Sequence, residues 1–99
     1  MTELVSHLIV QDTLRLPGLG LLVLPAAPEP LWLLQAALHT PFAITLPLSE
    51  YSSPIIGTVE EIAHIDQPPR RGLLLDFNPD ILLPAGSYLE VGKGDNILY

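Results

Sequence analysis

The chain has 99 residues, of which 48% are hydrophobic and 15% charged, so it is predicted to fold as one domain rather than to stay disordered. It has no cysteine, which excludes disulfides, thiolate nucleophiles and cysteine-ligated zinc. Its formal net charge of −7 argues against nucleic acid as a partner, because binding to phosphates normally needs a basic face.

Proline is the main feature that limits the secondary structure. Eleven prolines are spread from Pro17 to Pro84, and because proline lacks an amide donor they exclude long helices almost everywhere. No apolar run approaches the ~20 residues that span a bilayer, and the N-terminus lacks the basic region of a secretory signal. We therefore expect an all-β cytoplasmic protein with no membrane segment.

The N-terminal half predicts two strands and a short helix. Apolar and polar residues mostly alternate over Val5 to Leu16, which is typical of a strand with one buried face. Pro17-Gly18 predicts a tight turn, and a mostly apolar strand follows over Leu19 to Leu24. Between Glu29 and His39 the leucines have helical spacing, which favours a helix of one to three turns, with a strand as the alternative over Leu31 to Leu38.

The C-terminal half predicts four further strands. They cover Phe42 to Leu48, Ile55 to Ile65, Gly72 to Phe77 and Leu82 to Val91, the last with a turn at Pro84-Ala85-Gly86 just before Ser87. Asp66 to Arg71 contains Pro68-Pro69 and is predicted to be a turn region, and residues 92–99 are expected to form a flexible tail. Together these elements predict one domain over residues 1–99, a small closed or partly open β-barrel of about six strands with one short helical segment.

Short motifs along the chain resemble a known barrel. They are Leu8–Asp12, Leu16–Gly20, Thr40–Ile44, Ile56–Ile62, Gly72–Phe77 and Leu83–Leu89. In this order they are similar to the second domain of elongation factor Tu and related translational GTPases, over roughly residues 8 to 91. The resemblance implies a β-barrel that contacts protein partners and the end of a tRNA. The chain departs from the family in a longer, proline-rich segment from Pro25 to His39, and it has no GxxxxGK[ST] loop that would support GTP hydrolysis.

The sequence offers no recognisable catalytic constellation. His7, His39 and His64 are far apart and show no metal-ligand spacing. Glu60 and Glu61 are adjacent in a predicted strand, so their side chains should point to opposite faces and cannot share a proton between them. A carboxylate pair from two strands, such as Glu60 with Asp76, stays possible in principle. No GxSxG nucleophile elbow occurs, so we expect neither an enzyme nor a cofactor.

The favoured function is a non-catalytic, protein-binding barrel. Its acidic surface suits a basic partner protein, and one version is an immunity or inhibitor protein that masks a basic, nucleic-acid-cleaving enzyme. The alternatives are a translation-linked module that associates with RNA or a GTPase, a small enzyme with a site assembled across strands, a structural subunit, and negative charge that serves solubility alone. The oligomeric state stays open. The candidate partner-binding residues are Trp32, Glu60, Glu61, Arg70, Arg71 and Asp76.

Three of these candidates have a plain structural alternative. Trp32 is either an exposed anchor, since tryptophan is common at binding hot spots, or a core residue beneath the short helix. Arg70 and Arg71 follow two prolines and are expected to lie in a mobile loop, either as a small cationic cluster or as a solvated turn.

Overall fold

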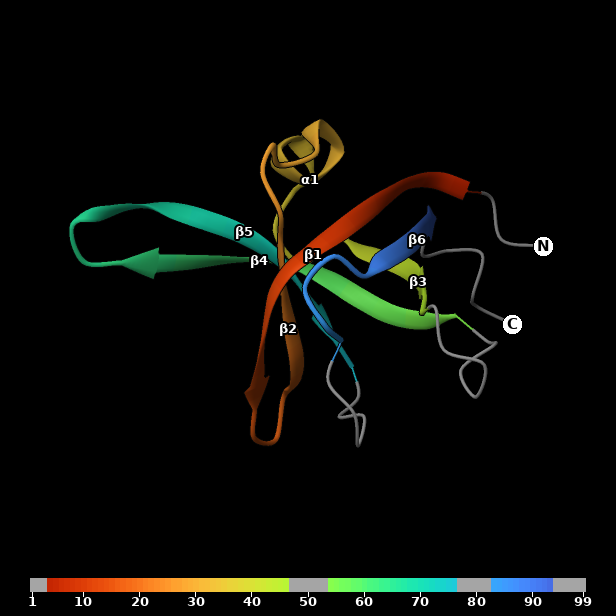
Figure 1. Cartoon of the computed structure of the whole chain (residues 1–99), viewed down its shortest axis with the longest axis horizontal. Helices are drawn as coiled ribbons and strands as arrows, with labels where there is room; N and C mark the ends of the chain where they lie inside the picture. The colour runs from red at the N-terminus through yellow and green to blue at the C-terminus, as the bar shows by residue number, and fades with distance from the viewer. Residues whose placement is uncertain (1–3, 47–53, 77–82, 94–99) are drawn as a thin grey trace.

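The computed structural model describes residues 4–46, 54–76 and 83–93, and these form six strands and one short helix. The strands close into one antiparallel barrel in the order β1-β2-β5-β4-β3-β6, which confirms the predicted all-β barrel (Figure 1). The elements are β1 (Leu4–Leu16), β2 (Gly20–Pro25), α1 (Leu31–Gln35), β3 (Pro41–Thr45), β4 (Ile55–His64), β5 (Gln67–Leu75) and β6 (Tyr88–Lys93).

The core is aliphatic and follows the two-residue period of the strands. Alternate residues such as Leu21 and Val23 on β2, or Leu73 and Leu75 on β5, are fully buried inside the barrel. No polar side chain of the described residues is buried. Each fully buried Leu, Ile or Val contributes about 1.5–3 kcal/mol relative to exposure. The core cluster comprises Leu8, Val10, Leu21, Val23, Leu33, Ile44, Leu46, Val59, Leu73, Leu75, Leu83, Leu89 and Val91.

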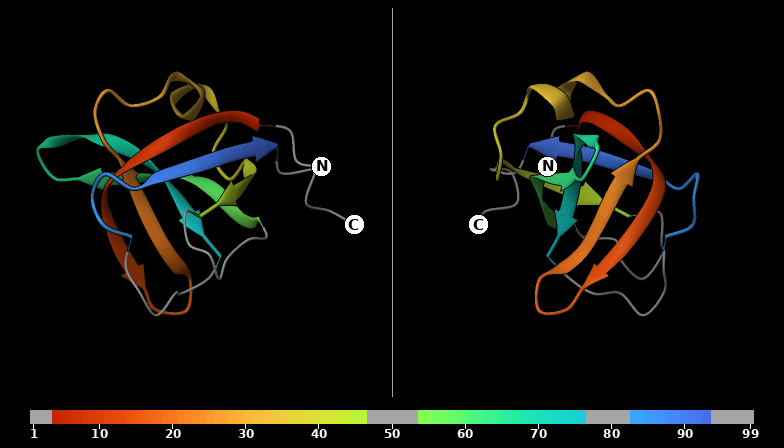
Figure 2. Two further views of the ribbon diagram at one scale, coloured as in Figure 1. Left: turned by 45° about the vertical axis from the view of Figure 1, so that its right-hand side comes forward. Right: turned by 90° about the vertical axis from the view of Figure 1, so that its left-hand side faces the viewer.

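Strand β1 closes the barrel because it pairs with different neighbours along its length. Its first half pairs with β6 and its second half with β2, and the register of the β2 pairing shifts between Val10 and Asp12. Such a bulge bends a strand and increases its twist, which lets β1 cross the barrel diagonally. Figure 2 shows β1 and β6 side by side, with α1 outside the sheet.

The β4–β5 hairpin projects beyond the barrel wall (Figure 1). Its turn is formed by Ile65 and Asp66, with Asp66 at a φ of 67°, a conformation that aspartate tolerates better than most residues. The predicted turn region from Asp66 to Arg71 is therefore wrong for all but its first residue, since β5 begins at Gln67. Prolines are tolerated there because they lie at the start of the strand, opposite a register shift in β4.

The predicted helix is confirmed within Glu29 to His39, and it follows Pro30, whose φ of −67° suits a helix start. Strand β2 begins at Gly20 rather than Leu19, because Leu19 closes the turn by donating its amide to Leu16. Strand β3 ends at Thr45, earlier than predicted, and the last two residues of that prediction, 47 and 48, lie outside the described residues.

The last strand, β6, starts later and ends later than predicted. The predicted turn before Ser87 is confirmed at Ala85 and Gly86, with Gly86 at a φ of 92°, and the strand begins after it at Tyr88. It continues to Lys93, so the prediction of a tail from residue 92 is wrong for 92 and 93. Residues 77, 82 and 94–99 of the predicted strands and tail lie outside the described residues.

Candidate protein-interaction surface

An apolar surface runs across the outer face of four neighbouring strands. The strand register aligns Leu14, Leu22, Leu74 and Thr58 in one row, and each alternates with inward-facing core residues. Leu22 is buried and Leu74 half-buried, whereas Leu14 is 55% exposed. Two more exposed side chains flank the row, at the β1–β2 turn and on β4. We call the set the apolar strip: Leu14, Leu19, Leu22, Ile56 and Leu74.

The apolar strip contains a hollow and has an acidic border. Leu19, Ile56, Thr58, Leu74 and Asp76 line a hollow of about 180 Å³. Leu19 is 61% and Ile56 37% exposed, so the strip presents large aliphatic groups to solvent beside the exposed carboxylate of Asp76. An apolar centre with a polar rim is the usual anatomy of a protein–protein interface.

Two further carboxylates lie on the other side of the strip. Asp12 pairs with Leu24 across β1 and β2, and Glu60 pairs with Gly72 across β4 and β5. The β2–β5 register places Leu24 beside Gly72, so Asp12 and Glu60 stand at the two ends of the row next to the strip. Three carboxylates therefore surround the apolar side chains.

Glu60 is held in place by two neighbours. The Thr58 hydroxyl donates to its carboxylate over 2.9 Å, and Nδ1 of His39 lies 3.0 Å from the carboxylate oxygens. The Glu60 side chain is 25% and the His39 ring 76% exposed, so this cluster sits at the surface. Glu61 points to the other face of β4, where its carboxylate is 3.7 Å from Nε of Arg71. The prediction that Glu60 and Glu61 face apart is confirmed.

Glu60 and Asp76 do not form a carboxylate pair. The amide of Asp76 donates to the carbonyl oxygen of Ile56 over 3.0 Å, and Glu60 lies four residues further along β4. The antiparallel register thus separates the two carboxylates, and the sequence spacing could not show this.

Arg70 and Arg71 are anchored within the fold, so the predicted mobile loop with a free or solvated cationic pair is wrong. Nη2 of Arg70 donates to Oε1 of Gln11 and to the Pro25 carbonyl, each over 3.1 Å. Nη1 of Arg71 donates to the carbonyl of Leu33 and to that of Ala36. The two guanidinium groups point to opposite faces of β5 because the residues are adjacent in a strand.

Of the two alternatives for Trp32, the structure matches a core residue beneath the short helix and not an exposed anchor. Its ring packs against the core and meets Phe42 edge-on, with ring centroids 5.2 Å apart. Its Nε1 donates to the carbonyl oxygen of His7 over 3.4 Å. The exposed apolar residues of the helix are instead Leu31, which is 65% exposed, and Leu34, which is 46% exposed.

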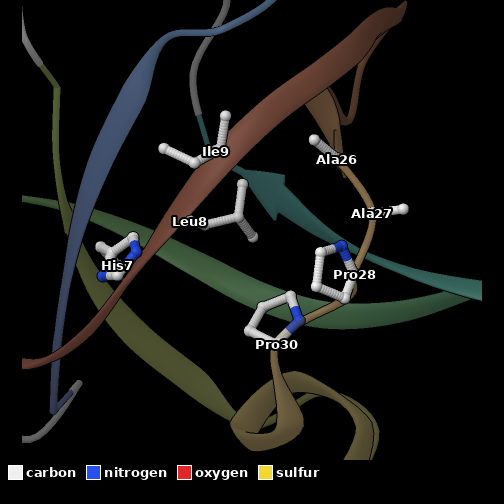
Figure 3. A pocket seen from close by; sticks show the side chains of 7 residues that line it. All are labelled: His7, Leu8, Ile9, Ala26, Ala27, Pro28 and Pro30. Carbon is white, nitrogen blue, oxygen red and sulfur yellow. The ribbon is translucent and has the colours of Figure 1, made fainter.

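A second hollow, of about 290 Å³, lies between β1 and the loop that follows β2 (Figure 3). On its β1 side the His7 ring stacks on Tyr88, with centroids 5.0 Å apart and planes 13° from parallel. No pattern in the sequence indicated this hollow, since alanines and prolines of the proline-rich segment after Leu24 build its loop wall. Its lining residues are His7, Leu8, Ile9, Ala26, Ala27, Pro28 and Pro30.

Within the described residues no three His, Asp or Glu side chains are grouped to hold a metal ion. His7 stacks on Tyr88 while His39 contacts Glu60. No helix among the described residues has the length and apolar character to cross a bilayer. No protein-family model matches this chain, and comparisons with curated proteins and with solved structures find no match either. The fold is thus a closed six-stranded antiparallel barrel, and the resemblance to translational GTPases stays a prediction.

Proposed function

We propose that this protein is a non-catalytic binding barrel whose apolar strip docks on a basic surface of another protein. The observation that carries the proposal is the exposure of Leu14, Leu19 and Ile56 on one outer face, bordered by the carboxylates of Asp12, Glu60 and Asp76. Burying such a strip removes apolar surface from water, which drives association at roughly 25 cal/mol per Å² before entropic costs.

The charge distribution supports a basic partner. A net charge of −7 attracts cationic proteins over a distance of about one Debye length, ~8 Å at physiological salt, and speeds their encounter. This net charge already includes both arginines of the β4–β5 hairpin, whose guanidinium groups donate to oxygens of the fold rather than projecting as free cations. Complementary charge then sets the orientation and rate, while the apolar strip supplies affinity.

A narrower version of the proposal is an immunity or inhibitor protein. Proteins that cleave nucleic acid carry basic surfaces for phosphate, and an acidic barrel could cover such a surface. The acidic border of the strip supports this version, since basic residues that ring an apolar contact on the partner would meet Asp12, Glu60 and Asp76.

Site-specific photo-crosslinking in the native host tests the proposal. A photoreactive residue at Leu19 should form an adduct with one basic protein, whereas the same residue at Leu31 should not, although both positions are highly exposed. Asp76→Lys and raised salt should both weaken the Leu19 adduct. Equal adducts from the two positions, no protein adduct at Leu19, or an adduct with RNA would each contradict the proposal.

A further inference from the structure

Within the described residues, no strand pairs with one edge of β1 over its N-terminal half, because the β2 pairing begins only at Val10. The backbone of Val10 bonds to the β6 side, because its amide donates to Ser87 over 2.9 Å and its carbonyl accepts from Gly86 over 2.7 Å. Backbone groups alternate sides along a strand, so His7 and Ile9 direct theirs away from β6. On that side β2 has already ended at Pro25.

The described bonds that cross the seam between β1 and the segment after β2 end on carbonyl oxygens of β1. The Ala26 amide donates to the Ile9 carbonyl over 2.8 Å, and Nε1 of Trp32 donates to the His7 carbonyl over 3.4 Å. Among the described residues, no backbone bond across the seam starts from the amide of His7 or of Ile9.

The 290 Å³ hollow lies at this edge, with His7, Leu8 and Ile9 on one side and the rings of Pro28 and Pro30 on the other (Figure 3). His7 is exposed and Ile9 is 37% exposed, so the edge is open to solvent. The hollow therefore combines an apolar wall with two backbone amides that have no backbone acceptor among the described residues.

We propose that this hollow accepts an extended segment of a partner protein by strand addition to β1. Carbonyl oxygens of the segment accept from the amides of His7 and Ile9, and one apolar side chain packs against Pro28 and Pro30. Main-chain bonds supply affinity in this mode of recognition, and side-chain pockets supply specificity.

A peptide fits this hollow because its two amide donors have the spacing of alternate residues in a strand. Two residues apart on β1, the amides are spaced by about 6.6 Å, which matches alternate carbonyls of an extended chain. The segment should carry a basic residue beside its apolar one, since Glu90 pairs with His7 across β1 and β6 and Glu29 lies between the two prolines. This inference shares one assumption with the proposed function, namely that the partner is a protein. It does not involve the apolar strip.

Amide exchange measured by NMR tests the free edge directly. In the unbound protein the amide protons of His7 and Ile9 should exchange at least about tenfold faster than those of Leu8 and Val10, which face β6. Twelve-residue peptides selected from a displayed library should combine apolar and basic residues, and their binding should slow exchange at His7 and Ile9. Amides that are already protected in the free protein, or a selection that yields no binding peptide, would overturn the inference.

Substitutions at Ile9 separate the backbone donor from the side chain. Ile9→Pro removes the amide without removing a β6 bond, and it should weaken the selected peptides by about tenfold, the loss of roughly one hydrogen bond. Ile9→Ala keeps the amide and should weaken them clearly less. Ala26→Phe, which fills the hollow, gives the same test if Ile9→Pro does not fold. If the selected peptides bind Ile9→Pro or Ala26→Phe as tightly as they bind the wild type, strand addition is refuted. A Leu19 crosslink that persists in these variants shows that the apolar strip acts independently.

Discussion

Arg71 donates from Nη1 to the carbonyl oxygen of Leu33, 3.2 Å away, and also to that of Ala36. These carbonyls lie at the end of α1, where a helix leaves its last acceptors without internal partners. The helix has five residues and no side-chain cap at its start, so it is too short to be stable alone. A side chain of β5 therefore joins the helix to the barrel.

Removing this link should destabilise the protein. Arg71→Leu is expected to lower the free energy of unfolding by about 1–3 kcal/mol, because carbonyls near the barrel surface lose a charged donor. Arg15→Leu is the matched control, since Arg15 is exposed on β1, and its effect should stay within about 0.5 kcal/mol. Urea unfolding followed by Trp32 fluorescence measures both. Equal losses in the two variants would contradict a special role for Arg71.

Two neighbouring residues of α1 should differ sharply in their contributions. Trp32→Ala removes a ring that packs against Phe42 and the core, and we expect a loss of about 2 kcal/mol, less than for a fully buried tryptophan. Leu31→Ala should change stability by no more than about 0.5 kcal/mol because Leu31 is 65% exposed. Thermal unfolding by circular dichroism compares them. A Leu31 effect as large as that of Trp32 would be inconsistent with this packing.

Gly72 lies where β5 approaches β2 closely. A Cβ at this position would stand 2.6 Å from the carbonyl oxygen of Val23, so Gly72→Ala must shift one strand backbone. We expect a loss of about 1–3 kcal/mol, the usual cost of overpacking. Gly57→Ala meets side-chain atoms of Ile44 and Leu75 instead, and it should cost less because these can rotate. Chemical denaturation should give this order, and the reverse order would count against the close strand approach.

His39 has a left-handed backbone, with a φ of 70°. His39→Val should lower stability by about 1–2 kcal/mol, because a β-branched residue fits this conformation poorly. His39→Gly loses the contact with Glu60 but relieves the backbone, so it should remain at least about 1 kcal/mol more stable than His39→Val. Melting temperatures of the two variants test this, and equal values would mean that the ring, not the backbone, matters at this position.

The apolar strip should contribute to binding without contributing to folding. Leu19→Ser is expected to change the free energy of unfolding by less than about 0.5 kcal/mol, since Leu19 is 61% exposed in a turn. The same change should weaken binding to the partner identified by crosslinking by about tenfold, measured in a direct binding assay, because burying a leucine side chain is worth about 1.5–3 kcal/mol. A Leu19→Ser variant that unfolds more easily yet binds normally would show that the strip is structural.

The spacing of apolar residues was enough to predict that six strands and one short helix exist, from two-residue alternation in the strands and from helical spacing of the leucines in the helix. Val5 to Leu16 and Ile55 to Ile65 match β1 and β4 to within one residue at each end, because burial on one face imposes a two-residue period on the sequence. Proline and glycine marked most turns correctly. The prolines at 68 and 69 led to a wrong prediction of a turn, since they lie in a strand that extends past the barrel wall.

What the sequence determined by itself is the class of the protein: an acidic, cysteine-free, all-β barrel with one short helix. Only the tertiary structure decided which side chains share a surface, because strand register brings together residues that are distant in the chain. Register placed Leu14 in a row with Leu74, separated Glu60 from Asp76, and turned Arg70 and Arg71 into internal anchors. The free edge of β1 likewise depends on where β2 ends, and no local pattern in the sequence encodes that.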